Sequence, residues 1–247
     1  MTLQCMKPPP GKLEADGYVI VPGVLSTDER HAVEYSLSAI AACGAGTRNL
    51  LAFQWCRMLA ARIAAHGVIQ TALQTCAVAV QCTLFDKSPD RNWLVALHQD
   101  VSIPVRNRVE HPALRGWSQK EGQYFVQPPV TLLQSLLAVR VHIDDCGPSN
   151  GPLRVVPGSH RRGRLHSREA ELLRDTTGNM VCAISAGDAL LMRPLLLHAS
   201  SKAAYPARRR VLHFLFGPAS PGYGLEWPDV VQSARPSDGP RLGASSG

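Results

Sequence analysis

Apolar and polar positions in the first part of the chain follow a strand pattern and then two helix patterns. Residues 18–21 are apolar, β-branched or aromatic, which predicts a short strand. Ser26 and Glu29 have the spacing of a capping box, and the amphipathic pattern that follows predicts a helix over residues 28–43. A second amphipathic helix is predicted over residues 50–65.

From residue 76 onward the pattern changes to apolar strands separated by turns rich in proline and glycine. Strands are predicted over residues 77–85, 94–100, 136–143, 153–156, 189–192 and 210–216. Strands at such intervals are typical of an antiparallel sandwich or a jelly roll. The fold class is therefore predicted to be mainly β, with the N-terminal helices packed on the outside.

The chain length and composition suit a single domain. A chain of 247 residues, of which 45% are apolar, can bury a sizeable core. We expect one domain over residues 1–226, with its core at residues 76–217. Residues 227–247 are polar and rich in Pro, Gly and Ser, which predicts a disordered tail. Residues 101–129 are expected to form a long loop that covers the substrate.

Cysteine usage and hydropathy indicate the compartment. The seven cysteines are scattered, odd in number and never spaced as C-x-x-C, so neither a disulfide framework nor a structural zinc site is expected. No apolar run reaches the length of a membrane span, and the first residues lack the apolar core of a signal peptide. The expected location is the cytoplasm, without a membrane partner.

The charge balance bears on the partner. The formal net charge is +7, with basic clusters at residues 161–164 and 208–210. Such a surface suits nucleic acid or an anionic small substrate. Aromatic residues make up only 6% of the chain, and nucleic-acid binders usually interleave aromatic with basic residues. The expected partner is therefore a small molecule and not a nucleic acid, and the protein is expected to be a monomer or a homodimer.

The run His98-Gln99-Asp100 is a candidate metal site. On a strand, residues two apart point to the same face, so His98 and Asp100 can reach one metal ion while Gln99 faces away. His198 follows a second predicted strand about a hundred residues downstream. Two histidines and one carboxylate leave coordination positions open, as O2-activating Fe(II) requires.

A candidate site for an oxoacid lies just beyond His198. Arg209 leads into the predicted strand over residues 210–216, where its guanidinium could hold the distal carboxylate of a bound 2-oxoacid in bidentate fashion. Ser200 is two residues past His198, so on a continuing strand it points the same way and can share that carboxylate.

These motifs, in this order, resemble the phytanoyl-CoA dioxygenase family, which includes ectoine hydroxylase. Residues 145–160 are similar to the family's D-x(4)-N-G-P-L-x-x-x-P-G-S-H stretch between its H-x-D motif and its distal histidine. The resemblance covers roughly residues 76–217. It implies a double-stranded β-helix (a cupin-like jelly roll), Fe(II) bound by His98, Asp100 and His198, and 2-oxoglutarate anchored by Arg209 with help from Ser200.

The resemblance also implies the reaction. Members of this family use 2-oxoglutarate and O2 as cosubstrates and hydroxylate a small molecule such as an amino acid, an acyl derivative or a biosynthetic intermediate. Related halogenases have a small residue at the position of Asp100, so hydroxylation is favoured over halogenation. Desaturation stays open as an outcome.

Arg140 departs from the family, because many members carry an aromatic residue about there. If its neighbours Val139 and Val141 pack into the core, Arg140 faces the mouth of the barrel and can meet 2-oxoglutarate or an anionic substrate. An outward-pointing arginine on the barrel exterior is the alternative.

Further candidates for the mouth of the barrel are weaker. Thr83 is a candidate for contact with the cosubstrate, and Gln81 alternates onto the same face as a substrate contact. Within the predicted covering loop, Trp117 is a candidate apolar wall and Gln127 a candidate polar contact with the substrate.

Two other functions stay open at this level. One is a demethylase or hydroxylase of nucleic acid or protein from the same superfamily, which only the basic charge favours. The other is a catalytically inactive β-helix that serves as a binding module, since fold does not fix function. The intact triad and Arg209 argue against the second.

Overall fold

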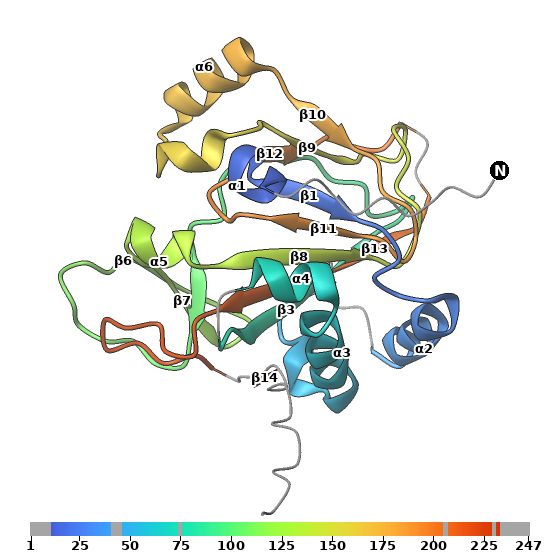
Figure 1. The fold of residues 1–247 in the computed structure, drawn as a ribbon, viewed down its shortest axis with the longest axis horizontal. Helices are drawn as coiled ribbons and strands as arrows, with labels where there is room; N and C mark the ends of the chain where they lie inside the picture. Colours follow the sequence, from blue (N-terminus) through green and yellow to red (C-terminus); the bar gives the residue numbers. More distant parts are fainter. Residues whose placement is uncertain (1–10, 41–45, 74–75, 205–206, 229–230, 233–247) are drawn as a thin grey trace, which may run out of the picture.

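The computed structural model describes residues 11–40, 46–73, 76–204, 207–228 and 231–232, which form a jelly roll of antiparallel sheets (Figure 1). The major sheet has the strand order β1 (Tyr18–Val21), β11 (Ala189–Met192), β8 (Leu137–His142), β13 (Arg209–Gly217), β3 (Val78–Lys87) and β14 (Val231–Gln232), with β2 (Gly46–Thr47) also paired to β3. The minor sheet has the order β10 (Met180–Cys182), β9 (Leu153–Val155), β12 (His198–Ser200) and β4 (Val95–His98). The mainly β fold predicted from the sequence is confirmed.

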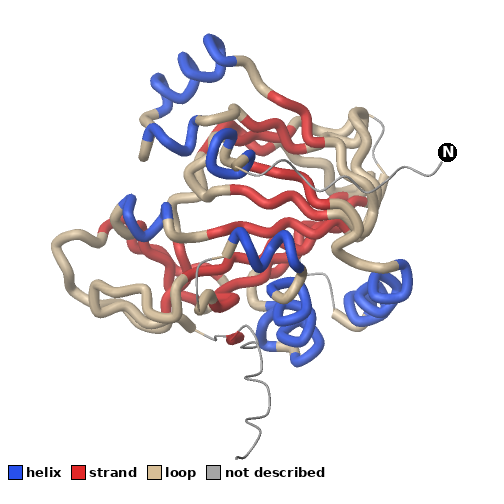
Figure 2. Tube along the Cα trace, in the orientation of Figure 1, coloured by secondary structure: helices blue, strands red, loops and turns tan. Residues whose placement is uncertain are grey.

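Helices surround these sheets (Figure 2). They are α1 (Lys12–Asp16), α2 (Thr27–Ser38), α3 (Gln54–Ala64), α4 (Gly67–Ala72), α5 (Val130–Gln134) and α6 (Ser167–Thr177), with short 3-10 turns η1 (Leu50–Ala52) and η2 (Ser159–Arg162). None of the described helices is long and apolar enough to cross a membrane.

The predicted N-terminal elements form, with shorter helices than expected. The strand over residues 18–21 is β1, which pairs antiparallel with β11. The capping box is present: Ser26 Oγ accepts from the Glu29 N–H at 3.2 Å, and the Glu29 carboxylate accepts from the Ser26 N–H at 2.8 Å. However, α2 ends at Ser38, and residues 41–45 lie outside the described residues. The helix predicted over residues 50–65 begins with the 3-10 turn η1 and continues as α3.

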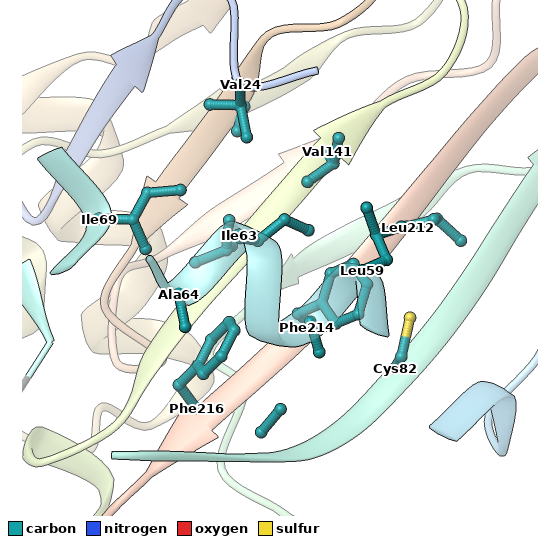
Figure 3. Packing of buried hydrophobic residues seen from close by; sticks show 14 of the residues in the cluster. Val24, Leu59, Ile63, Ala64, Ile69, Cys82, Val141, Leu212, Phe214 and Phe216 are labelled. Carbon is teal, nitrogen blue, oxygen red and sulfur yellow. The ribbon is translucent and has the colours of Figure 1, made fainter. Parts of the chain in front are cut away.

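Helices α2, α3 and α4 cover the outer face of the major sheet. Figure 3 shows Ile63 of α3 beside Val141 of β8 and Phe214 of β13 in one apolar cluster, all of them buried. Buried apolar surface of this kind contributes about 25 cal/mol per Å² to stability. The helices therefore pack against one face of the major sheet, and the opposite face lines a cavity inside the barrel.

Two expectations about irregular segments were wrong. Residues 101–129 do not form a long loop, because they fold into a third sheet of β5 (Ile103–Val105), β7 (Gln123–Gln127) and β6 (Arg115–Lys120). The tail does not begin at residue 227: Trp227 is buried, and its Nε1 donates to the Pro218 carbonyl at 2.7 Å. Strand β14 pairs with β3, whereas residues 233–247 lie outside the described residues. Buried apolar side chains in both segments supply the contacts that the polar composition concealed.

Candidate active site

Two strands of the minor sheet bring the predicted histidines together. β4 and β12 are antiparallel neighbours, and His98 pairs directly with His198 in their register. Asp100 lies two residues past the end of β4, where its N–H donates to the Pro194 carbonyl at 2.9 Å. The carboxylate is therefore positioned by an irregular segment held to Pro194 beyond the strand, and not by strand alternation as the sequence predicted.

The three side chains converge on one point. One nitrogen of each histidine and one Asp100 oxygen all lie within 4.8 Å of one another. Asp100 Oδ1 is 3.5 Å from Nε2 of His98, and Asp100 Oδ2 is 3.7 Å from Nε2 of His198. A group this tight can hold a metal ion at its centre.

Backbone carbonyls orient both imidazole rings in the same way. Nδ1 of His98 lies 2.8 Å from the Ala96 carbonyl, and Nδ1 of His198 lies 2.8 Å from the Leu196 carbonyl. A carbonyl only accepts, so each Nδ1 carries the proton and each Nε2 presents a lone pair. Such outer hydrogen bonds are the usual support of metal-binding histidines. The donor set therefore fits a divalent metal ion.

The charge of Asp100 dominates the electrostatics of the cluster. Burial raises the pKa of Asp100, but the nearby His198 and the hydrogen bond with His98 lower it by more, so the pKa lies well below its ordinary value. Burial lowers the pKa of His198 to about 4. Burial also lowers the pKa of His98, but Asp100 raises it by more, and the net shift is upward. A carboxylate beside a neutral His198 is the protonation state that a metal requires.

Gln99 anchors the loop around the cluster. Its Nε2 donates to the Gly163 carbonyl at 2.8 Å and to the Leu195 carbonyl at 2.7 Å, and its Oε1 accepts from the Leu165 N–H at 2.9 Å. These bonds tie the segment that carries His98 and Asp100 to the segment that leads into His198.

The cluster opens into a cavity of about 380 Å³ between the sheets. Alternate residues of the major sheet line it: Gln81, Thr83, Phe85 and Lys87 of β3, Arg140 and His142 of β8, and Arg209, Val211, His213 and Leu215 of β13. Of the residues predicted from the sequence, the cavity brings together Gln81, Thr83, Arg140, Ser200 and Arg209 with the histidines and Asp100.

Trp117 and Gln127 do not line this cavity. Trp117 packs against a second buried apolar cluster, which includes Leu114 and Val126, and the Arg108 guanidinium lies 5.7 Å from its ring centre. Gln127 lies against Gly116, and its Oε1 accepts from Arg164 at 3.3 Å. Both belong to the third sheet, which reaches the cavity through other residues, namely Ile103, Lys120 and Phe125.

One end of the cavity is strongly basic. Arg209 is 6% exposed and stands opposite Lys87 in the register of β13 and β3. Lys87 Nζ lies 3.4 Å from Ser200 Oγ and donates to the Trp93 carbonyl at 2.7 Å. Burial lowers the pKa of Lys87 to about 8, with Arg209 adding to the effect. Lys87 was not predicted from the sequence, although Gln81, Thr83 and Lys87 are spaced so that all three lie on one face of the strand.

The Asn150-Gly151 motif supports Arg209. Gly151 has a φ of +60°, and a Cβ there would lie 2.6 Å from the Ser201 carbonyl oxygen, so only glycine fits. The Gly151 carbonyl accepts from Nη1 of Arg209, which also lies 3.3 Å from Cys146 Sγ. Nε of Arg209 is buried without a hydrogen-bond partner. The motif thus fixes one side of the guanidinium and leaves the Nε side for a ligand.

Arg140 points into the cavity and not to the barrel exterior. Its Nη1 donates to Nδ1 of His213 at 2.9 Å, and its guanidinium lies 5.1 Å from the centre of the Phe85 ring. Burial lowers the pKa of His213 to about 3, with the charge of Arg140 as the second cause. Next to this group, Gln81 Nε2 donates to Thr83 Oγ1 at 3.3 Å.

A jelly roll that presents two histidines and a carboxylate to an open cavity defines the class of non-haem metal-dependent oxygenases. The family model described as "Phytanoyl-CoA dioxygenase (PhyH)" matches residues 13–211. The chain therefore belongs to the phytanoyl-CoA dioxygenase family, as the motif order indicated. No curated protein matches the sequence significantly.

Solved structures share the fold at low sequence identity. EctD from S. alaskensis, in its apoform, superposes with a TM-score of 0.65 at 18% identity, covering 92% of this chain and 86% of that chain. The non-heme alpha ketoglutarate dependent epimerase SnoN from nogalamycin biosynthesis has a TM-score of 0.63 at 18% identity, covering 87% and 83%. HygX from Streptomyces hygroscopicus, with nickel, 2-oxoglutarate and hygromycin B bound, has a TM-score of 0.57 at 19% identity, covering 83% and 84%.

Proposed function

We propose that the protein is an Fe(II)- and 2-oxoglutarate-dependent dioxygenase that hydroxylates a small molecule. The observation that carries the proposal is the convergence of His98, Asp100 and His198 on the wall of an open cavity. Two neutral imidazoles and one carboxylate suit Fe(II) and leave coordination positions for other ligands. Bound iron would supply the activation of O2, with 2-oxoglutarate as the source of two electrons.

The basic end of the cavity is proposed to hold the cosubstrate. Arg209 offers its unpartnered Nε, and Ser200 offers a hydroxyl next to it, to the distal carboxylate of 2-oxoglutarate. Lys87 adds a second positive charge beside Ser200. Charge-assisted bonds from a rigid guanidinium suit a carboxylate in both geometry and energy. Thr83, which pairs directly with His213 in the register of β3 and β13, is proposed to contact the cosubstrate from the middle of the same cavity.

The size of the cavity supports a small substrate. A volume of about 380 Å³ lies within the range of pockets that enclose small ligands. Its walls also carry apolar side chains, among them Phe85, Val211 and Leu215, which can exclude water from the reacting centre. HygX, a neighbour in fold, has been crystallised with hygromycin B and 2-oxoglutarate bound, which supports a cavity that holds a small molecule beside the cosubstrate.

The test begins with anaerobic titration of the metal-free protein with Fe(II) and then 2-oxoglutarate, followed by visible spectroscopy. The expected result is a charge-transfer band that needs both components, and succinate release on exposure to O2. A library of amino acids, acyl derivatives and other small metabolites is then screened for compounds that increase succinate release. A protein that binds neither Fe(II) nor 2-oxoglutarate is an inactive binding module, and the proposal fails.

A further inference from the structure

Arg140 carries a charge that the proposed iron and cosubstrate contacts do not use. Among the described residues, no carboxylate lies within ion-pair distance of its guanidinium, and its buried Nε has no hydrogen-bond partner. Its two neighbours, His213 and the face of Phe85, are both neutral, since burial and Arg140 itself keep His213 uncharged. A buried arginine held by neutral groups and left with an open N–H is prepared for an anion.

Strand geometry separates Arg140 from the basic end of the cavity. In the major sheet Arg140 stands opposite His213, which is four residues along β13 from Arg209. At roughly 3.3 Å per residue, the backbones that carry the two arginines are about 13 Å apart along the strand direction. With Arg209, Ser200 and Lys87 proposed to hold 2-oxoglutarate at one end, the Arg140 guanidinium is left nearer the middle of the same cavity.

The charge balance of the cavity points to an anion in addition to 2-oxoglutarate. Arg140, Arg209 and Lys87 are cations on its wall, and among the described lining residues Asp100 is the one carboxylate. A divalent metal ion and the dianion of 2-oxoglutarate cancel one another, so the loaded cavity keeps its positive excess. Lys120 lines the same cavity nearer the solvent and adds to the field that attracts anions.

We propose that Arg140 is a specificity-determining residue that binds the anionic group of the substrate, so that the substrate is a small organic carboxylate or phosphate with an apolar part. The apolar part packs against the walls that Phe85, Val211 and Leu215 provide. This inference rests on the proposed function for the role of the cavity. It differs from a cosubstrate role for Arg140, in which the same guanidinium would bind 2-oxoglutarate.

The test uses hexanoate, hexyl phosphate and the uncharged hexanamide as probes, which share one alkyl chain and differ in the head group. Binding to the anaerobic Fe(II)–2-oxoglutarate complex and to the metal-free protein is followed by nuclear magnetic resonance of the probe protons. We expect the wild-type protein to bind one or both anions at least about tenfold more tightly than hexanamide, as one charge-assisted hydrogen bond implies. The stronger of the two anions identifies the head group.

Three variants locate the effect. Arg140→Met should lose that preference at least about tenfold while 2-oxoglutarate affinity changes less than about threefold, and Arg140→Lys should restore part of it. Arg168→Met removes the same charge from an exposed position on α6 that does not line the cavity, and should change anion binding by less than about threefold. Circular dichroism confirms that each variant is folded.

The outcomes separate this inference from the proposed function. Equal binding of hexanamide and the anions by the wild-type protein overturns it, and so does an Arg140→Met variant that loses 2-oxoglutarate as strongly as it loses the probe. If the wild-type protein binds neither Fe(II) nor 2-oxoglutarate, the proposed function fails. The probe preference of the metal-free protein, and its loss in Arg140→Met, then still decide whether Arg140 forms an anion site.

Discussion

The two faces of the major sheet are built from alternate residues of the same strands, yet they serve opposite purposes. On the outer face, Val141 and Phe214 are fully buried among apolar side chains and helix α3. On the inner face, their sequence neighbours Arg140 and His213 line the cavity. Burial of apolar side chains on the outer face stabilises the fold, whereas burial of polar groups on the inner face destabilises it.

Unpartnered polar atoms show where that cost falls. Arg140 Nε, His142 Nδ1 and Arg209 Nε are buried without hydrogen-bond partners, and all three belong to the inner face. Such atoms cost stability unless a ligand satisfies them. A change on the inner face should therefore affect binding more than folding, and a change on the outer face should affect folding more than binding.

The largest expected effect is on metal binding, at the cluster that faces the inner side of the sheet. Asp100→Ala should weaken Fe(II) binding by more than about a thousandfold and abolish succinate release, since removing even an outer partner of a metal ligand costs roughly 10–100-fold. The melting temperature of the metal-free protein should stay within a few degrees. Fe(II) titration and differential scanning calorimetry measure both, with the exposed Asp90→Ala as control. If Asp100→Ala binds iron with wild-type affinity, Asp100 is not a metal ligand.

On the outer face, we expect a substitution to lower stability and to leave ligand binding unchanged. Phe214→Ala should lower the free energy of unfolding by about 3–5 kcal/mol, because it leaves a cavity in the buried cluster. The fraction that remains folded should bind 2-oxoglutarate normally. Tyr35→Ala, at a side chain that is 82% exposed, should change stability by less than about 0.5 kcal/mol. Urea unfolding checks both values, and a loss for Phe214→Ala no larger than that for Tyr35→Ala would contradict the contrast.

Adjacent arginines allow a sharper version of the comparison. Arg209→Ala should weaken 2-oxoglutarate binding by about 10–100-fold, the equivalent of one or two charge-assisted hydrogen bonds, with iron affinity little changed. Arg208 is the next residue along the chain, but it is exposed and contacts Asp86 at 3.4 Å, so Arg208→Ala should alter that affinity less than about twofold. Anaerobic titration with 2-oxoglutarate measures the difference. If the two variants bind 2-oxoglutarate with equal affinity, Arg209 is not its anchor. Another cation of the cavity would then hold the carboxylate, and Lys87 would be tested first.

The smallest effect concerns the pH dependence of stability. Burial, with help from Arg140, lowers the pKa of His142 to about 3, whereas an unfolded histidine has a pKa of about 6.5. The unfolded state therefore binds more protons between these values, and stability is lost as the pH falls. Between about pH 6.5 and pH 5 the loss from this residue is at most about 2 kcal/mol. Urea unfolding of the metal-free protein should show a shallower pH dependence for His142→Leu than for the wild type or for His31→Leu, where His31 is exposed; identical slopes would contradict a buried, neutral His142.

Much of the candidate site could be predicted because its residues occur in short motifs with fixed spacing. His98, Asp100 and His198 were identified from the order and spacing of residue types, and the capping box of Ser26 and Glu29 from a three-residue interval. Local geometry decides such features, since side chains on a strand alternate every two residues and this capping box needs only one hydroxyl and one carboxylate three residues apart. The same period predicted which strand residues share a face with Arg140.

The two-residue alternation along a strand could not predict which segments pair or which face of a sheet lies inside the barrel. The polar segment over residues 101–129 gave no strong strand pattern, and its three-stranded sheet depends on apolar contacts with the rest of the barrel. For the same reason Trp117 and Gln127 were assigned to the cavity, whereas Lys87 was overlooked.

The family, the strand alternation and the candidate metal ligands could be read from the sequence alone, because each depends on residues close together in the chain or on a fixed motif order. The chain fold was needed to show that His98 lies opposite His198, that Lys87 lies opposite Arg209, and that Arg140 lies opposite His213. Each of these pairs joins segments far apart in the chain. For the two pairs in the major sheet, a shift of register by one residue would turn the apolar outer face away from the helices, so packing of that face leaves the alternate side chains to meet inside the cavity.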